Sequence, residues 1–317
     1  MLILTLELEQ TTNKGGNIMT EAAAAKINIK NKNEVAKRSL MAETWRRLKR
    51  SRTAIFGLIL IIIFLCMAIF APLIGDYNED ALKMNIRERL QGPTIDHWFG
   101  TDEFGRDIFI RIVYGTRISL FVGLISVSIA LSIGGFFGAI AGYYGGRIDN
   151  IIMRLLDVVL AIPVILLAIT IVAALGPSML NLMIAIGVAN IPGFARVVRA
   201  AVLSVKDEEY IEAARAIGAK DHVIILKHVI PNSMAPIIVY ATLKVATAIM
   251  ATASLSFIGL GVQPPTPEWG SMLSSGRAYI RDEMYIVLFP GLAIVLSVLS
   301  LNLIGDGLRD ALDPKLK

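Results

Sequence analysis

The stretch Lys206–Pro236 reads KDEEYIEAARAIGAKDHVIILKHVIPNSMAP and forms a charged, helix-prone island between two long apolar runs. Three acidic residues open it, where the positive end of a helix dipole favours negative charge: Glu208, Glu209 and Glu212. Gly218 falls where a first helix needs a left-handed closing residue. Asp221 is expected to cap a second short helix, and Pro231 is expected to end it. The stretch therefore predicts a helix, a sharp turn and a second helix outside a bilayer that both flanks enter. An ordinary solvated loop is the alternative interpretation.

Composition places the whole chain among polytopic membrane proteins. Of its 317 residues, 55% are apolar, the mean hydropathy is +0.64, and charged residues make up only 18%. The net charge of +5 comes largely from a basic N-terminal part, because eleven of the 31 Lys and Arg precede Ala54. Such a stretch beside a span indicates membrane orientation and anionic lipid as a partner, not nucleic acid. Cys66 is the single cysteine, so no intramolecular disulfide forms.

The N-terminal part is expected to lie outside the membrane. Residues 1–36 are polar without an apolar period and predict a disordered cytoplasmic segment, with Met19 as an alternative start. No cleavable signal sequence is expected, because the charged lead is too long. Residues 37–53 alternate basic and apolar side chains at helical spacing, which predicts an amphipathic helix on the inner membrane surface.

An all-α membrane domain with six transmembrane helices is expected over residues 54–317. The expected spans are residues 54–74, 118–141, 158–175, 179–198, 235–262 and 284–304. When the N-terminus is placed inside, 18 Lys and Arg of the short connecting segments fall inside and eight outside. This asymmetry predicts that both termini and Lys206–Pro236 lie in the cytoplasm.

Several motifs resemble those of ATP-binding-cassette importer permeases. Glu212-Ala213-Ala214, then Gly218, then Pro231 resembles the family's EAA loop, although His228 and Ile230 replace the Ile and Leu of the family pattern. Three further stretches resemble the dipeptide and oligopeptide branch: HWFGTDEFGRD at 97–107, QPPTPEWG at 263–270 and NLIGDGLRD at 302–310. Together, these motifs extend the resemblance to about residues 45–317.

The resemblance implies a type I ABC importer fold and a role in peptide import. It implies four kinds of partner, namely a homologous second permease subunit, two ABC ATPase subunits, an extracytoplasmic peptide-binding protein and the lipid of a bacterial or archaeal cytoplasmic membrane. It also implies that a helical coupling loop docks in an ATPase groove. The residues expected there are Glu208, Glu209, Glu212, Ala213, Ala214, Gly218, Asp221, His228 and Pro231. ATP and Mg²⁺ are expected only in the partners, because the chain lacks a Gly-x-x-x-x-Gly-Lys-Ser/Thr phosphate loop.

Two ionisable residues are expected at membrane depth, where charge is costly and faces protein or a water path. Asp157 is interpreted as an interfacial anchor or as part of the pathway. Lys244 is interpreted as lining the pathway or the seam with the second permease subunit. Asp149 and Asp157 are expected to pair locally with Arg147 and Arg154.

Rival functions remain open from the sequence. An ion-coupled secondary transporter would need paired acids or an internal repeat near the midplane, and neither is found. An intramembrane enzyme would need a nucleophile and a base, and the three histidines, His97, His222 and His228, form no plausible metal set. Within the importer family, permeases for nickel or other small solutes look alike, so the cargo cannot be read.

Overall fold

The computed structural model describes residues 44–312 and divides into two compact units, with the boundary in the sequence after Ser51. In the first unit, residues 44–48 are helical, and the Lys49 ammonium lies 5.1 Å from the centroid of the Trp45 ring. This short helix falls within the amphipathic helix expected over residues 37–53. The remainder of that expected helix before residue 44, and the expected disordered segment 1–36, lie outside the described residues.

The second unit is built from long helices, and no strand occurs among its described residues. Five helices are long and apolar enough to cross a membrane, or six if one bent pair counts as a span. Among the described residues these are α2 (Arg52–Ile74), α3 (Ile108–Tyr144), α6 (Met179–Leu203), the helical run Asp221–Phe257 that contains α9 (Ile230–Phe257), and α11 (Tyr285–Leu312). The expected all-α membrane fold is therefore confirmed.

The expected third span is wrong as a single helix over residues 158–175. The chain instead forms α4 (Gly146–Leu160) and α5 (Val164–Leu175), with an 81° bend between them. Pro163 explains the break, because proline lacks an N–H donor and disfavours helical geometry in the residue before it. With twelve residues, α5 is about 18 Å long, shorter than a hydrocarbon core of about 30 Å.

Other helices extend beyond the apolar stretches that predicted them. α3 begins at Ile108 instead of residue 118, because the Asp107 carboxylate caps it by accepting a hydrogen bond of 2.9 Å from the Ile110 N–H. α9 occupies 230–257 instead of 235–262, and α11 continues to Leu312. A prediction from hydropathy finds the apolar part of a helix, whereas hydrogen bonding and caps decide where the helix ends.

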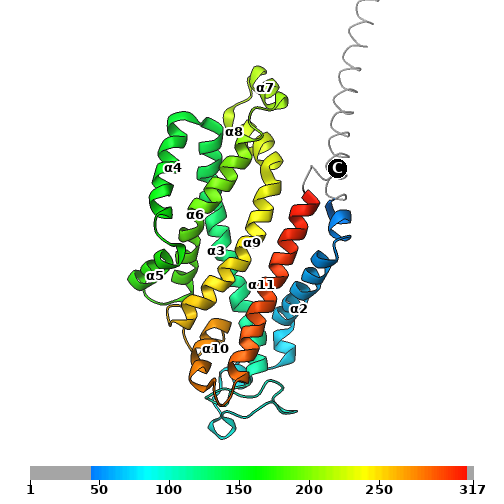
Figure 1. The fold of residues 1–317 in the computed structure, drawn as a ribbon, viewed down its shortest axis with the longest axis vertical. Coiled ribbons are helices and arrows are strands. Elements are labelled where there is room, and N and C mark those ends of the chain that lie inside the picture. Colours follow the sequence, from blue (N-terminus) through cyan, green and yellow to red (C-terminus); the bar gives the residue numbers. More distant parts are fainter. Residues whose placement is uncertain (1–43, 313–317) are drawn as a thin grey trace, which may run out of the picture. The chain divides into compact units, whose positions relative to one another are not determined.

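The most extensive helix contact of the unit is the one between α3 and α6, which lie next to each other in Figure 1. Three glycines of α3 recur every fourth residue along this contact: Gly134, Gly138 and Gly142. A Cβ added at these positions would lie 2.5, 2.4 and 2.9 Å from the carbonyl oxygens of successive turns of α6. Small residues at this spacing let two backbones approach closely, as in packed membrane helices.

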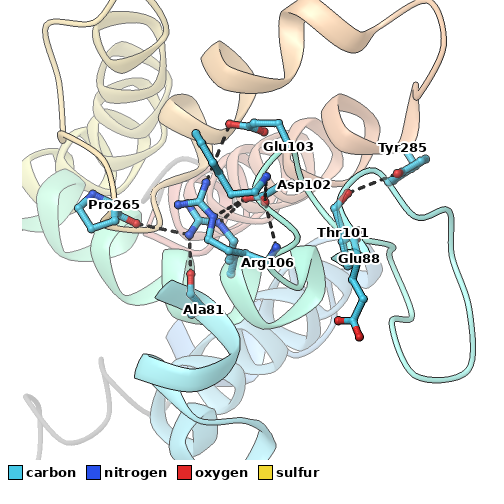
Figure 2. A network of polar contacts seen from close by, with 10 residues as sticks. Ala81, Glu88, Thr101, Asp102, Glu103, Arg106, Pro265 and Tyr285 are labelled. Atoms are coloured by element: carbon cyan, nitrogen blue, oxygen red, sulfur yellow. Dashed lines mark hydrogen bonds and ion pairs between the residues drawn. The ribbon is translucent and has the colours of Figure 1, made fainter. Parts of the chain in front are cut away.

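The end of the unit that carries α10 (Trp269–Gly276) is held by a buried polar network (Figure 2). Arg111 of α3 is only 4% exposed and donates hydrogen bonds to the carbonyl oxygens of Ala81 and Pro265. Its guanidinium lies 3.5 Å from the Asp102 carboxylate, which also accepts a 2.7 Å hydrogen bond from Arg106. The network therefore fastens two connecting segments, the one before α3 and the one before α10, to the first turns of α3.

Candidate functional site

A helical hairpin forms the opposite end of the unit, where α7 and α8 project in Figure 1. It consists of α7 (Glu209–Ala216), α8 (Asp221–Ile224) and the π-helical turn η3 (Ile225–Val229). We use "hairpin" for residues 208–230. The predicted order of helix, turn and helix is confirmed.

Gly218 closes the first helix in a left-handed conformation, with φ of +80°. The Gly218 N–H donates to the Arg215 carbonyl at 2.9 Å, and the Ala219 N–H donates to the Ala214 carbonyl at 3.1 Å. These two bonds form a Schellman motif, which satisfies carbonyls at a helix end that would otherwise lack a donor. The predicted left-handed conformation of Gly218 at the end of the first helix is confirmed.

Two details of the second helix differ from expectation. Lys220, not Asp221, is the N-cap residue, and the Asp221 side chain makes no capping hydrogen bond. Pro231 does not end the helix, because α8, η3 and α9 follow one another without a break. The wide turn η3, in which the Ile230 N–H reaches the Ile225 carbonyl, accommodates the proline at the start of α9. The hairpin is therefore continuous with a candidate span.

The inner face of the hairpin is fixed to α3 and α6. Its buried apolar residues pack in one cluster with the ends of these helices: Ile211, Ala214, Ile224 and Val229. Tyr143 of α3 donates a 2.8 Å hydrogen bond to the Asp221 carboxylate, while the Arg215 guanidinium lies 5.3 Å from the centroid of its ring. Tyr143 thus links both arms of the hairpin to α3. The sequence alone did not single out Tyr143, because a tyrosine near the end of a span usually indicates a residue at the membrane interface.

The outer face of the hairpin combines acidic and apolar exposure. Glu208, Glu209, Glu212 and Ala213 are exposed, whereas Ala214 is buried and His228 is intermediate. Large apolar side chains stand among them, with Ile217 85% exposed and Leu226 64% exposed. Sequence reasoning missed both. The exposed residues of the hairpin therefore include both acidic and apolar ones.

A polar groove lies between α4 and α6. Arg199 of α6 binds the Asp149 carboxylate with two hydrogen bonds of 2.6 Å, and Arg196 binds Asp157 at 2.6 Å. The expected local pairing with Arg147 and Arg154 is therefore wrong. The cause is the spacing of α4, which turns positions 149, 153 and 157 together towards α6.

Lys244 lies elsewhere, on α9. It is half-buried, and its ammonium lies 5.4 Å from the centroid of the Tyr240 ring. It does not line the groove between α4 and α6, so the structure does not bring Lys244 and Asp157 into one site. Within residues 44–312, no three His, Cys, Asp or Glu side chains gather in a way that could hold a metal ion.

A bundle of long apolar helices with a helical hairpin at one end defines a membrane-embedded protein. The comparisons with known proteins agree with this class. Residues 134–317 match the binding-protein-dependent transport system inner membrane component, and residues 39–93 match the N-terminal TM domain of oligopeptide transport permease C. The chain belongs to this family, the permease components of ABC importers.

Individual relatives cover most of the chain. It is 55% identical to the dipeptide transport system permease protein DppC of Alkalihalophilus pseudofirmus, over 87% of this chain and 90% of that protein. It is 47% identical to the glutathione transport system permease protein GsiD of Escherichia coli, with the same coverage. Inward-facing structures of the MetNI methionine ABC transporter share the fold at 20% identity; one has a TM-score of 0.54 and covers 65% of this chain and 98% of that chain.

Proposed function

We propose that the chain is the permease subunit of an ATP-driven importer of dipeptides and oligopeptides. The observation that supports peptides as the cargo is the 55% identity to a dipeptide transport permease across nearly the full length of both chains. The chain contributes half of a pathway whose other half is a homologous permease subunit. Two ABC ATPase subunits and an extracytoplasmic peptide-binding protein complete the assembly.

The hairpin is the part that receives force. In this proposal it faces the cytoplasm, as do both termini, and its outer face docks in a groove of one ATPase subunit. The acidic residues steer the contact, and Ile217 and Leu226 supply apolar burial. Because α8 continues through η3 into α9, movement of the hairpin tilts α9 directly. The Tyr143 contacts carry the same movement to α3.

No bond chemistry is assigned to this chain. We expect the purified chain alone to hydrolyse no ATP, because it carries no phosphate loop, and ATP with Mg²⁺ binds in the partners. The measurement is phosphate release by the detergent-solubilised chain, with and without the ATPase subunits. Specific ATP turnover by the chain alone would contradict the proposal.

The cargo is tested by uptake of a labelled dipeptide into proteoliposomes that contain the complete transporter and its binding protein. Glutathione is the second candidate, favoured by the 47% identity to a glutathione transport permease. Nickel or another small solute is a third. Unlabelled dipeptides should compete with the label, and glutathione and Ni²⁺ should not. Uptake of glutathione or nickel without uptake of any dipeptide or oligopeptide would replace the proposed cargo.

A further inference from the structure

The groove between α4 and α6 has the size and chemistry of a small-ligand site. Its volume is about 350 Å³, near the lower end of the roughly 300–1,000 Å³ found for ligand pockets. Six residues line it: Asp149, Asn150, Met153, Asp157, Arg196 and Arg199. Four of them are charged, two of each sign, although the helices that present them belong to the membrane-embedded unit.

The two faces of α4 differ in polarity, and the charged face lines the groove. The outward face exposes an apolar row at helical spacing: Ile148, Ile151, Leu155 and Val158. The opposite face turns Asp149, Met153 and Asp157 to α6. Charged groups at membrane depth face water or protein because acyl chains cannot solvate them. The apolar row therefore screens the groove from lipid, and the groove can hold water and a polar solute.

The two ion pairs of the groove differ in how fully they are satisfied. Arg199 and Asp149 form a bidentate pair, and the Asp149 side chain is only 13% exposed. Arg196 and Asp157 share one hydrogen bond, and their side chains remain 56% and 53% exposed. A guanidinium offers five N–H donors and a carboxylate about four acceptor positions. The Arg196–Asp157 pair therefore keeps most of its hydrogen-bonding capacity for a ligand.

We propose that this groove binds the charged ends of a short zwitterionic peptide during its passage, an inference that rests on the proposed peptide transport. The peptide carboxylate binds the Arg196 guanidinium, and the peptide ammonium binds the Asp157 carboxylate. Binding breaks the Arg196–Asp157 ion pair and forms two ion pairs with the peptide. The loss of the internal pair offsets part of the gain, so binding is weak, as release from a transport pathway requires. Because only the two ends of the peptide are contacted, peptides with different side chains can bind.

The test is protection of a cysteine in the groove within the complete transporter. Cys66 is replaced by alanine, Asn150→Cys is introduced, and a maleimide is added to inside-out membrane vesicles. A zwitterionic dipeptide at ~4 Kd should slow labelling about fivefold. The N-acetylated, C-amidated dipeptide should not protect, and Arg196→Gln should remove protection. The double variant Asp157→Asn with Arg196→Gln leaves no unpaired charge, so it repeats the test if the single variant folds poorly.

Arg154→Cys is the matched control, because it is exposed on the same helix but does not line the groove. Its labelling should be the same with and without peptide. Absence of labelling at Asn150→Cys, equal protection by the blocked dipeptide, or no protection at all would each overturn the inference. Dipeptide uptake by the same complex separates the two ideas, since uptake without protection rejects only the groove, whereas absent uptake rejects the proposed cargo.

Discussion

Gly218 connects α7 to the second arm of the hairpin in a left-handed backbone conformation. At φ of +80°, a β-branched side chain is strained by about 1–2 kcal/mol, even though no atom lies within 4 Å of an added Cβ. Gly218→Val should therefore tilt the two arms of the hairpin without unfolding the spans, and peptide uptake should fall steeply.

Gly218→Asn is the matched control, because asparagine tolerates the left-handed conformation. It should retain most uptake and most co-purification of the ATPase subunits. Equal activity of the valine and asparagine variants, at matched membrane levels, would show that the turn geometry does not matter.

Glu212 tests the charge of the docking surface. It is exposed in the first turns of α7, so Glu212→Lys removes a favourable interaction with the helix dipole and places a positive charge on the outer face. Co-purification of the ATPase subunits should fall, and more so at low salt, where charges are less screened. Lys220→Ala, an exposed change in the adjoining turn, should have little effect. If both variants retain the ATPase subunits equally, the acidic face takes no part in docking.

Beside the apolar packing, the Tyr143 hydroxyl group gives the hairpin a hydrogen bond to α3. Tyr143→Phe keeps the ring beneath Arg215 but loses the hydrogen bond to Asp221, a net loss of about 0.5–1.5 kcal/mol. We expect ATP hydrolysis by the assembled transporter to persist while peptide taken up per ATP falls. The exposed neighbouring change Tyr144→Phe is the control, and Asp221→Asn, which keeps an acceptor, should be nearly normal. An unchanged ratio of uptake to hydrolysis in Tyr143→Phe would remove the tyrosine from the coupling path.

How far the elements could be predicted follows from the range of the interactions that set them. Apolar runs and glycine at a turn are local signals, and they predicted the long helices and the hairpin. Asp149 and Asp157 find partners 50 and 39 residues away, so no local pattern could identify Arg199 and Arg196. Pro163 breaks the helix locally, but α4 and α5 both pack against α6, and no local pattern gives the 81° angle between them.

Different interactions stabilise the two ends of the helical unit. Apolar burial fixes the hairpin to α3 and α6, whereas the segment before α3 combines apolar packing with polar contacts, and those of His97 change with pH. His97 lies 2.8 Å from the Asp107 carboxylate and 3.5 Å from that of Glu88, with its side chain 21% exposed. Partial burial lowers the pKa of His97, but the hydrogen bonds and charges of these two carboxylates outweigh it and raise the pKa above 6.5.

The sign of this shift gives a prediction for the stability of the whole protein. Because the folded state binds the His97 proton more tightly than the unfolded state, its contribution is full below the unfolded pKa of 6.5. That contribution is lost as pH rises through the higher folded-state pKa. The thermal midpoint in detergent should therefore fall more between about pH 5.5 and about pH 8.5 in the unaltered protein than in His97→Gln. His222→Gln, an exposed change in the hairpin, should keep the full fall. If His97→Gln loses as much stability over this range as the unaltered protein, the ion pairs of His97 do not contribute to stability.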